Sequence, residues 1–187
     1  HQPLSPTTDY GRFKRDCEEV LKASKLKYFI LRPAGVFGYA PRMRFDLSVN
    51  MMTAHAALNG EILVAGGEQS RPHVHIRDLI DVILRLLTAN INSDVFNVVY
   101  ANQRIELTAR IVARTVEKWL KREISVMVSE RTDDRSYLVS GDKLRQILSF
   151  ECRRNIEDGV GELCHAFKRG QWPDALENKV YSNVAPV

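Results

Sequence analysis

The chain has 187 residues, of which 27 are basic and 23 acidic, so its net charge is +4, and 44% of its residues are hydrophobic. This length can bury one core, and the composition is that of an ordinary globular protein. The basic residues are spread along the chain, which argues against nucleic acid as a partner. No apolar run approaches the ~20 residues that cross a bilayer, and no secretory signal is visible at the N-terminus, so no membrane partner is predicted.

The cysteine and histidine positions argue against disulfide bonds and a metal site. Cys17, Cys152 and Cys164 form no CxxC pair, and the five histidines show neither HxxxH nor HExxH spacing. These patterns do not fit a disulfide framework or a zinc centre. They fit a reducing compartment, so we expect a cytoplasmic protein.

Strands and helices are predicted to alternate along the chain, beginning with a helix that Thr8 or Asp9 caps. A loop is expected over 34–42, and Gly60 is expected to end the second helix as a C-cap. The expected helices lie at about 8–24, 45–60, 76–89, 106–121, 140–150 and 155–170, and the expected strands at 27–33, 61–65, 72–75, 95–99 and 123–130. This order predicts the α/β fold class.

The stretch DYGRFK places Tyr10 and Lys14 four residues apart in the first predicted helix. Residues at this spacing share one helix face. An ammonium group beside a phenol favours the phenolate, and a tyrosine so placed can act as general acid or base near neutral pH. A Tyr and a Lys at this spacing are also common surface neighbours, so the pair alone does not establish a catalytic site.

Four motifs occur in a meaningful order: YGRFK, LRPAGVFG, RPHVHIRD and DDRSYLVSGDKLRQILSF. Together they resemble the C-terminal half of the extended short-chain dehydrogenase/reductases, and more narrowly the NAD-dependent epimerase/dehydratase family that acts on nucleotide sugars. The resemblance runs from about residue 3 to about residue 172. It implies the C-terminal part of a Rossmann-like fold.

The resemblance assigns catalysis to Tyr10 and Lys14. In the family, the tyrosine moves a proton at a sugar hydroxyl while NAD or NADP takes hydride, and the lysine holds the nicotinamide ribose. Pro33 and Val36, in LRPAGVFG, match a loop beside the nicotinamide, although a plain strand-to-loop turn explains them equally well.

The family's glycine-rich turn, which binds the cofactor pyrophosphate, has no counterpart in these 187 residues. We therefore expect a piece of a longer enzyme whose N-terminal half, absent here, binds most of the cofactor. The piece alone should be inactive, and one edge of its first strand should lack a neighbour. Residues 1–42 would end the Rossmann-like domain with the Tyr-x-x-x-Lys helix and the following strand. Residues 43–187 would form mainly a substrate-binding α/β subdomain.

The resemblance also implies a nucleoside-diphosphate-sugar site. Arginine suits a diphosphate because its planar fork makes paired, charge-assisted hydrogen bonds. The candidate residues are Arg42, Arg44 and Asn50 near the second helix, Leu63 and Val64 beside the nucleobase, and Arg71 and Arg135 at the diphosphate. A solvated loop is the alternative for the first three.

Three further expectations complete the sequence-based picture. His75 is predicted to be a packed or hydrogen-bonded histidine, and Asp78 is predicted to cap the helix that begins at residue 76. The apolar stripe of Phe13, Cys17, Val20 and Leu21 predicts a homodimer face. Two functions stay open: part of a nucleotide-sugar epimerase, dehydratase or reductase, or a non-catalytic module that binds a nucleotide sugar or a protein.

Overall fold

The computed structural model describes residues 5–130 and 136–183. Its elements follow one another as α1 (Asp9–Ala23), β1 (Phe29–Pro33), β2 (Gly35–Phe37), α2 (Ser48–Asn59), β3 (Glu61–Ala65), β4 (Ser70–His75), α3 (Ile76–Thr88), β5 (Asp94–Val98), β6 (Ala101–Arg104), α4 (Ile105–Leu120), β7 (Ser125–Ser129), α5 (Asp142–Leu148), α6 (Ile156–Lys168) and a short 3₁₀ turn, Lys179–Tyr181. The α/β class predicted from the sequence is confirmed.

The strands form three small sheets. β1 pairs with β5 and β3 pairs with β7, both in parallel, whereas β4 lies between parallel β2 and antiparallel β6. Within the described residues β5 is the one strand paired with β1. The prediction of a loop over 34–42 is wrong at β2, and β6 was not predicted at all.

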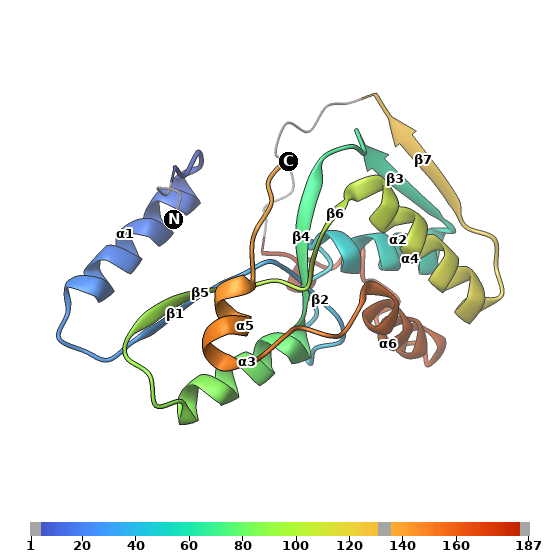
Figure 1. Ribbon diagram of the computed structural model, residues 1–187. Helices are drawn as coiled ribbons and strands as arrows, with labels where there is room; N and C mark the ends of the chain where they lie inside the picture. The colour runs from blue at the N-terminus through green and yellow to red at the C-terminus, as the bar shows by residue number, and fades with distance from the viewer. Residues whose placement is uncertain (1–4, 131–135, 184–187) are drawn as a thin grey trace.

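Besides a smaller apolar cluster around Phe45, two apolar cores pack on the strands. One lies where α2, α4 and α6 pack on β3, around Val64, Val112 and Val160. The other joins β1, β5, α3 and α5 around Val82, Phe96 and Leu144 (Figure 1). Two strand pairs, β1 with β5 and β2 with β4, join residues 1–42 to residues 43–187. The division into two units at residue 42 stays a prediction.

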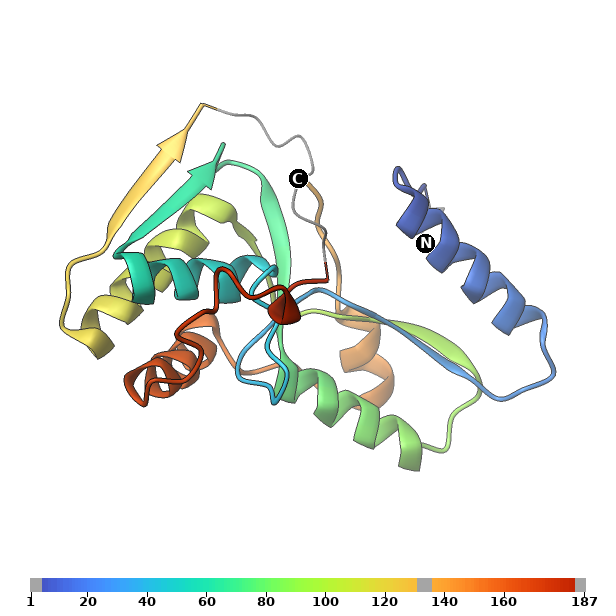
Figure 2. The same cartoon turned by 180° about the vertical axis from the view of Figure 1, so that it is seen from behind.

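Helix α1 stands apart from both cores (Figures 1 and 2). Thr8 caps it by accepting a hydrogen bond from Gly11 N at 3.1 Å, as expected, but the helix buries none of its residues. Its link to the sheet is a two-pronged ion pair in which Arg32 of β1 donates to Glu18 at 2.5 and 2.7 Å. This pair raises the pKa of Arg32 and lowers that of Glu18.

The described residues form no helix that is both long and apolar enough to cross a membrane. They also contain no cluster of three or more His, Cys, Asp or Glu side chains that could hold a metal ion.

Candidate functional site

A cleft of about 1290 Å³ opens between α1 and the carboxyl end of β1. Pro33 and Ala34 line it from β1, Pro72 from β4, and Tyr137 from the segment before α5. Ligands of open α/β sheets bind outside the carboxyl ends of the strands, so this cleft is the best-placed candidate site. Of the two expected cofactor contacts, Pro33 lines the cleft, whereas Val36 packs against the core around Phe96.

Tyr10 and Lys14 lie on one face of α1, as their spacing predicts. The Lys14 Nζ atom is 5.5 Å from the centroid of the Tyr10 ring, and Tyr10 is 72% exposed. The pKa of Arg44 is raised chiefly by the hydrogen bonds that it donates to Asp46. Neither Tyr10 nor Lys14 is among the described residues that line the cleft.

Residues 38–46, here called the arginine loop, carry Arg42 and Arg44. Arg44 makes a two-pronged ion pair with Asp46 at 2.6 and 2.8 Å, and this pair lowers the pKa of the Asp46 carboxyl. Arg42 donates to the side-chain oxygen of Asn183 at 2.7 Å. Both arginines thus have partners within the chain, and a diphosphate would compete with these contacts.

Asn50 is hydrogen-bonded to the backbone at both ends of the arginine loop. It is buried, its side-chain oxygen accepts from Gly38 N, and its side-chain nitrogen donates to Arg44 O, both at 3.1 Å. In this structure Asn50 binds the backbone of the loop, and it would act on a ligand through Arg44.

The two predicted base-binding residues point in opposite directions, because successive side chains of a strand alternate between its faces. Leu63 is 65% exposed, whereas Val64 is 1% exposed and belongs to the core of α2, α4 and α6. The expectation that both side chains flank a base is therefore wrong for Val64. A base on the open face of β3 would meet Leu63.

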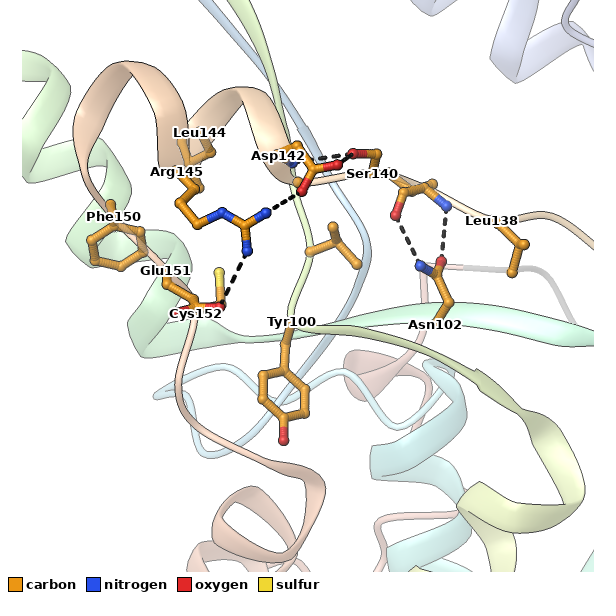
Figure 3. A pocket seen from close by; sticks show the side chains of 13 residues that line it. Tyr100, Asn102, Leu138, Ser140, Asp142, Leu144, Arg145, Phe150, Glu151 and Cys152 are labelled. Carbon is orange, nitrogen blue, oxygen red and sulfur yellow. Dashed lines mark hydrogen bonds and ion pairs between the residues drawn. The ribbon is translucent and has the colours of Figure 1, made fainter.

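Arg71 lies on β4 at the edge of the cleft, with its guanidinium 5.7 Å from the centroid of the Tyr137 ring. Tyr137 belongs to a strap, residues 136–141, which Asn102 of β6 holds by two hydrogen bonds to the backbone of Val139 (Figure 3). Arg135, the second predicted diphosphate ligand, lies outside the described residues. The strap that follows Arg135 lies beside Arg71.

A second pocket, of about 520 Å³, lies behind the strap (Figure 3). Its charged groups pair with one another: Arg145 lies between Asp142, at 2.6 Å, and Glu151, at 3.7 Å. Asp142 also accepts from the Ser140 hydroxyl at 2.8 Å. Because these polar groups already bond to one another, we interpret them as structural support for the strap and not as a ligand site.

His75 is packed, as predicted, but the expected cap of α3 by Asp78 is wrong. The cap is His75, whose Nδ1 accepts from Arg77 N at 3.2 Å. Asp78 is buried and accepts from Arg153 N and Arg154 N at 3.0 Å, and from the Arg154 side chain at 2.5 Å. Asp78 therefore ties α3 to the segment that leads into α6.

Sequence reasoning missed three residues that shape this region: Asp46, Glu162 and Asn183. Asp46 fixes Arg44, Asn183 contacts Arg42, and Glu162 of α6 accepts a hydrogen bond from Tyr39 N at 3.1 Å. Asp46 lies two residues from Arg44, a spacing that could have suggested the pair. The other two act across more than a hundred residues, and no local pattern in the sequence signals them.

The parallel β1–β5 pair, with a tyrosine and a lysine on the helix before it, defines a Rossmann-like α/β protein of the short-chain dehydrogenase type. The model of the NAD dependent epimerase/dehydratase family matches residues 1–99 of this chain, and the chain belongs to that family.

Similar proteins support the same fold. The chain is 27% identical over 172 residues to UDP-glucuronic acid decarboxylase 1 of Xenopus tropicalis, a match that covers 89% of this chain and 40% of that protein. A UDP-N-acetylglucosamine 4-epimerase from Methanobrevibacter ruminantium M1, in complex with UDP-N-acetylmuramic acid, matches with a TM-score of 0.73 and 23% identity over 91% of this chain and 56% of that one. RMD from Pseudomonas aeruginosa, complexed with NADPH, matches with a TM-score of 0.73 and 16% identity over 91% and 60%.

Proposed function

We propose that this chain forms the substrate-binding part, with the acid–base pair, of an enzyme that acts on nucleoside-diphosphate sugars. The observation that carries the proposal is the pairing of Tyr10 with Lys14 on α1, a helix whose Arg15, Glu19 and Lys22 line the cleft at the carboxyl end of β1. The names of the similar proteins, a UDP-glucuronic acid decarboxylase and a UDP-N-acetylglucosamine 4-epimerase, support the substrate class.

In the proposed mechanism the Tyr10 hydroxyl exchanges a proton with a sugar hydroxyl. Lys14, which lies beside the Tyr10 ring on α1, would bind the nicotinamide ribose. Arg71 and Arg135, with Arg42 or Arg44 from the arginine loop, neutralise the diphosphate, because guanidinium groups make paired hydrogen bonds to phosphate oxygens. Asn50 acts through Arg44, and Leu63 offers an apolar contact to the base.

A nicotinamide cofactor would supply the hydride acceptor of this reaction. Among the described residues, Lys14 and Pro33 fit its ribose and nicotinamide ends. The chain has no glycine-rich strand-turn-helix segment for the pyrophosphate. The proposal therefore assigns most of the cofactor's binding to a separate dinucleotide-binding half, and the 187 residues alone should not turn over substrate.

The exposed stripe on α1 supports a homodimer in the assembled enzyme. Phe13 is 63% and Val20 is 74% exposed, and Cys17 beside them is exposed as well. Burying such apolar area against a second copy would be favourable. Sedimentation of the assembled enzyme as a monomer would count against this part of the proposal.

The alternative, a non-catalytic binding module, is favoured by one observation: Tyr10 is 72% exposed, on a helix that buries none of its residues. The substitution Tyr10→Phe separates the two functions. In a protein that joins this chain to a dinucleotide-binding half, loss of the proton-transfer group should lower turnover by about 10²–10⁴ while nucleotide-sugar affinity is kept. Tyr28→Phe, outside α1, is the control. Unchanged turnover of Tyr10→Phe would contradict the catalytic role.

A further inference from the structure

His75 lies at the junction of β4 and α3, where its ring is tightly packed. It is fully buried, and the Phe37 ring meets its ring edge-on at 5.2 Å between centroids. A Cβ atom at Gly38 would come within 2.5 Å of the His75 Nε2, and one at Gly159 within 3.2 Å of its Cδ2. The imidazole is therefore held between the start of the arginine loop and helix α6.

The contacts of the ring define its tautomer. Nδ1 accepts a hydrogen bond from Arg77 N at 3.2 Å, so Nδ1 carries a lone pair. Burial lowers the pKa of His75 and therefore favours the neutral ring. The charges of Arg154 and Arg77 also lower this pKa, whereas those of Glu162 and Asp78 raise it. The single ring proton is thus on Nε2, because a neutral imidazole has one donor and one acceptor nitrogen.

The Nε2–H group faces the Glu162 carboxylate. Nε2 lies 3.3 Å from Glu162 Oε2, in ion-pair range but without the alignment of a hydrogen bond. The same Oε2 accepts from Tyr39 N at 3.1 Å, and Oε1 lies 3.3 Å from the Arg77 guanidinium. One carboxylate therefore connects the β4–α3 junction, α6 and the arginine loop.

We propose that His75 is a positioning residue for the arginine loop: through Glu162 it sets where Tyr39, and hence Arg42 and Arg44, stand relative to α3 and α6. Capping alone does not require histidine, because Asn, Ser or Asp caps a helix well. The imidazole adds a second nitrogen, Nε2, which lies beside the Glu162 carboxylate that accepts from Tyr39 N. The consequence for ligand binding rests on the proposed function.

The first arm of the test is the tautomer itself. Nitrogen-15 NMR of the ¹⁵N-labelled protein at pH 7 should show His75 with a protonated Nε2 and an unprotonated Nδ1. A proton on Nδ1, in either the other tautomer or the imidazolium form, would overturn the proposal.

The second arm uses His75→Asn, which keeps a capping oxygen but loses the reach to Glu162, and Glu162→Gln, which keeps the side-chain shape but loses the charge. In both variants the Tyr39 amide should exchange with solvent about tenfold faster, while the first turn of α3 keeps its protection. His55→Asn, on α2, is the control. Wild-type exchange at Tyr39 in both variants would overturn the proposal, and Glu162→Gln decides the matter if His75→Asn does not fold.

The third arm is a titration with UDP. Both variants should bind UDP several-fold more weakly than the wild type does, because the arginine loop is less well placed. If the wild-type chain binds no UDP, the proposed nucleotide site fails, and the NMR and exchange results still decide the role of His75.

Discussion

Helices α1 and α3 show how differently the two sides of the site are supported. Both are capped at their first turn, but α1 buries none of its residues whereas α3 buries Asp78, Val82 and Leu86. Asp78 and His75 further connect α3 to α6, and α1 meets the sheet through the pair of Glu18 and Arg32. The proposed substrate side is held by its own core, and the proposed acid–base pair lies on the helix with the least support.

A pH-dependent effect on stability is expected from His73 of β4, on the well-supported side. Burial, aided by the charge of Arg71, lowers its pKa to about 4. Because the folded state disfavours the charged ring, the stabilisation is complete above pH 6.5 and is lost as the pH falls toward 4. The free energy of unfolding should drop by about 2 kcal/mol between pH 7 and pH 5.

Urea unfolding of the wild type, His73→Gln and His55→Gln at both pH values checks this. The His73 variant should lose the His73 share of the pH dependence and keep that of the buried His75, whereas the His55 variant should keep all of it. Equal pH dependence in all three proteins would contradict the assignment.

Two glycines of α6 differ in how closely the neighbouring side chains pack against them. A Cβ at Gly159 would meet the Phe37 ring at 2.5 Å, whereas one at Gly161 would meet the Trp119 side chain at 3.2 Å, and Trp119 is partly exposed. Gly159→Ala should therefore destabilise the protein by about 1–3 kcal/mol, as overpacked cores do. Gly161→Ala should be close to neutral, because the gain in helix propensity offsets a small adjustment of the indole. Thermal unfolding of both variants measures the difference, and equal stabilities would contradict the packing.

The smallest global effect is expected at Glu18, although its local effect is large. The lowered pKa of Glu18 means that its pair with Arg32 stabilises α1 above pH 4.5 and is lost as the pH falls through the folded value. Glu18→Gln should cost less than about 1 kcal/mol overall, since both partners keep contact with solvent. Amide exchange along α1 should nevertheless accelerate, whereas Glu19→Gln should change little. Unaltered exchange in Glu18→Gln would show that other contacts hold α1.

The sequence was most informative where a pattern is local. Periodicity and capping residues located α1, and the second helix ends at Gly60 with the left-handed backbone expected of a C-cap, although it begins at Ser48 and not near residue 45. β2 was missed because its three residues, in a short stretch between Pro33 and Gly38, resemble part of a turn. β6, Ala-Asn-Gln-Arg, was missed because its polar sequence owes its strand geometry to pairing with β4.

In the candidate site, too, the features that depend on a local pattern could be predicted and those that depend on distant contacts could not. The spacing of Tyr10 and Lys14, and the diphosphate chemistry of arginine, could be read from the residues. The partners of those arginines could not, because the contacts of Asn183 with Arg42 and of Glu162 with Tyr39 depend on the folding of distant segments. The opposite directions of the Val64 and Leu63 side chains, in contrast, follow from the alternation of side chains along a strand and could be predicted from the sequence.

Calorimetric titration of this chain with UDP tests the proposed nucleoside-diphosphate site most directly. We expect saturable binding that weakens by about 1.5–3 kcal/mol in Arg71→Ala, the range for hydrogen bonds to a charged group. Arg110→Ala, which removes an exposed ion pair with Glu106 on α4, should bind as the wild type does. Absence of UDP binding by the wild type, or equal affinity in Arg71→Ala, would contradict a nucleoside-diphosphate site beside β4.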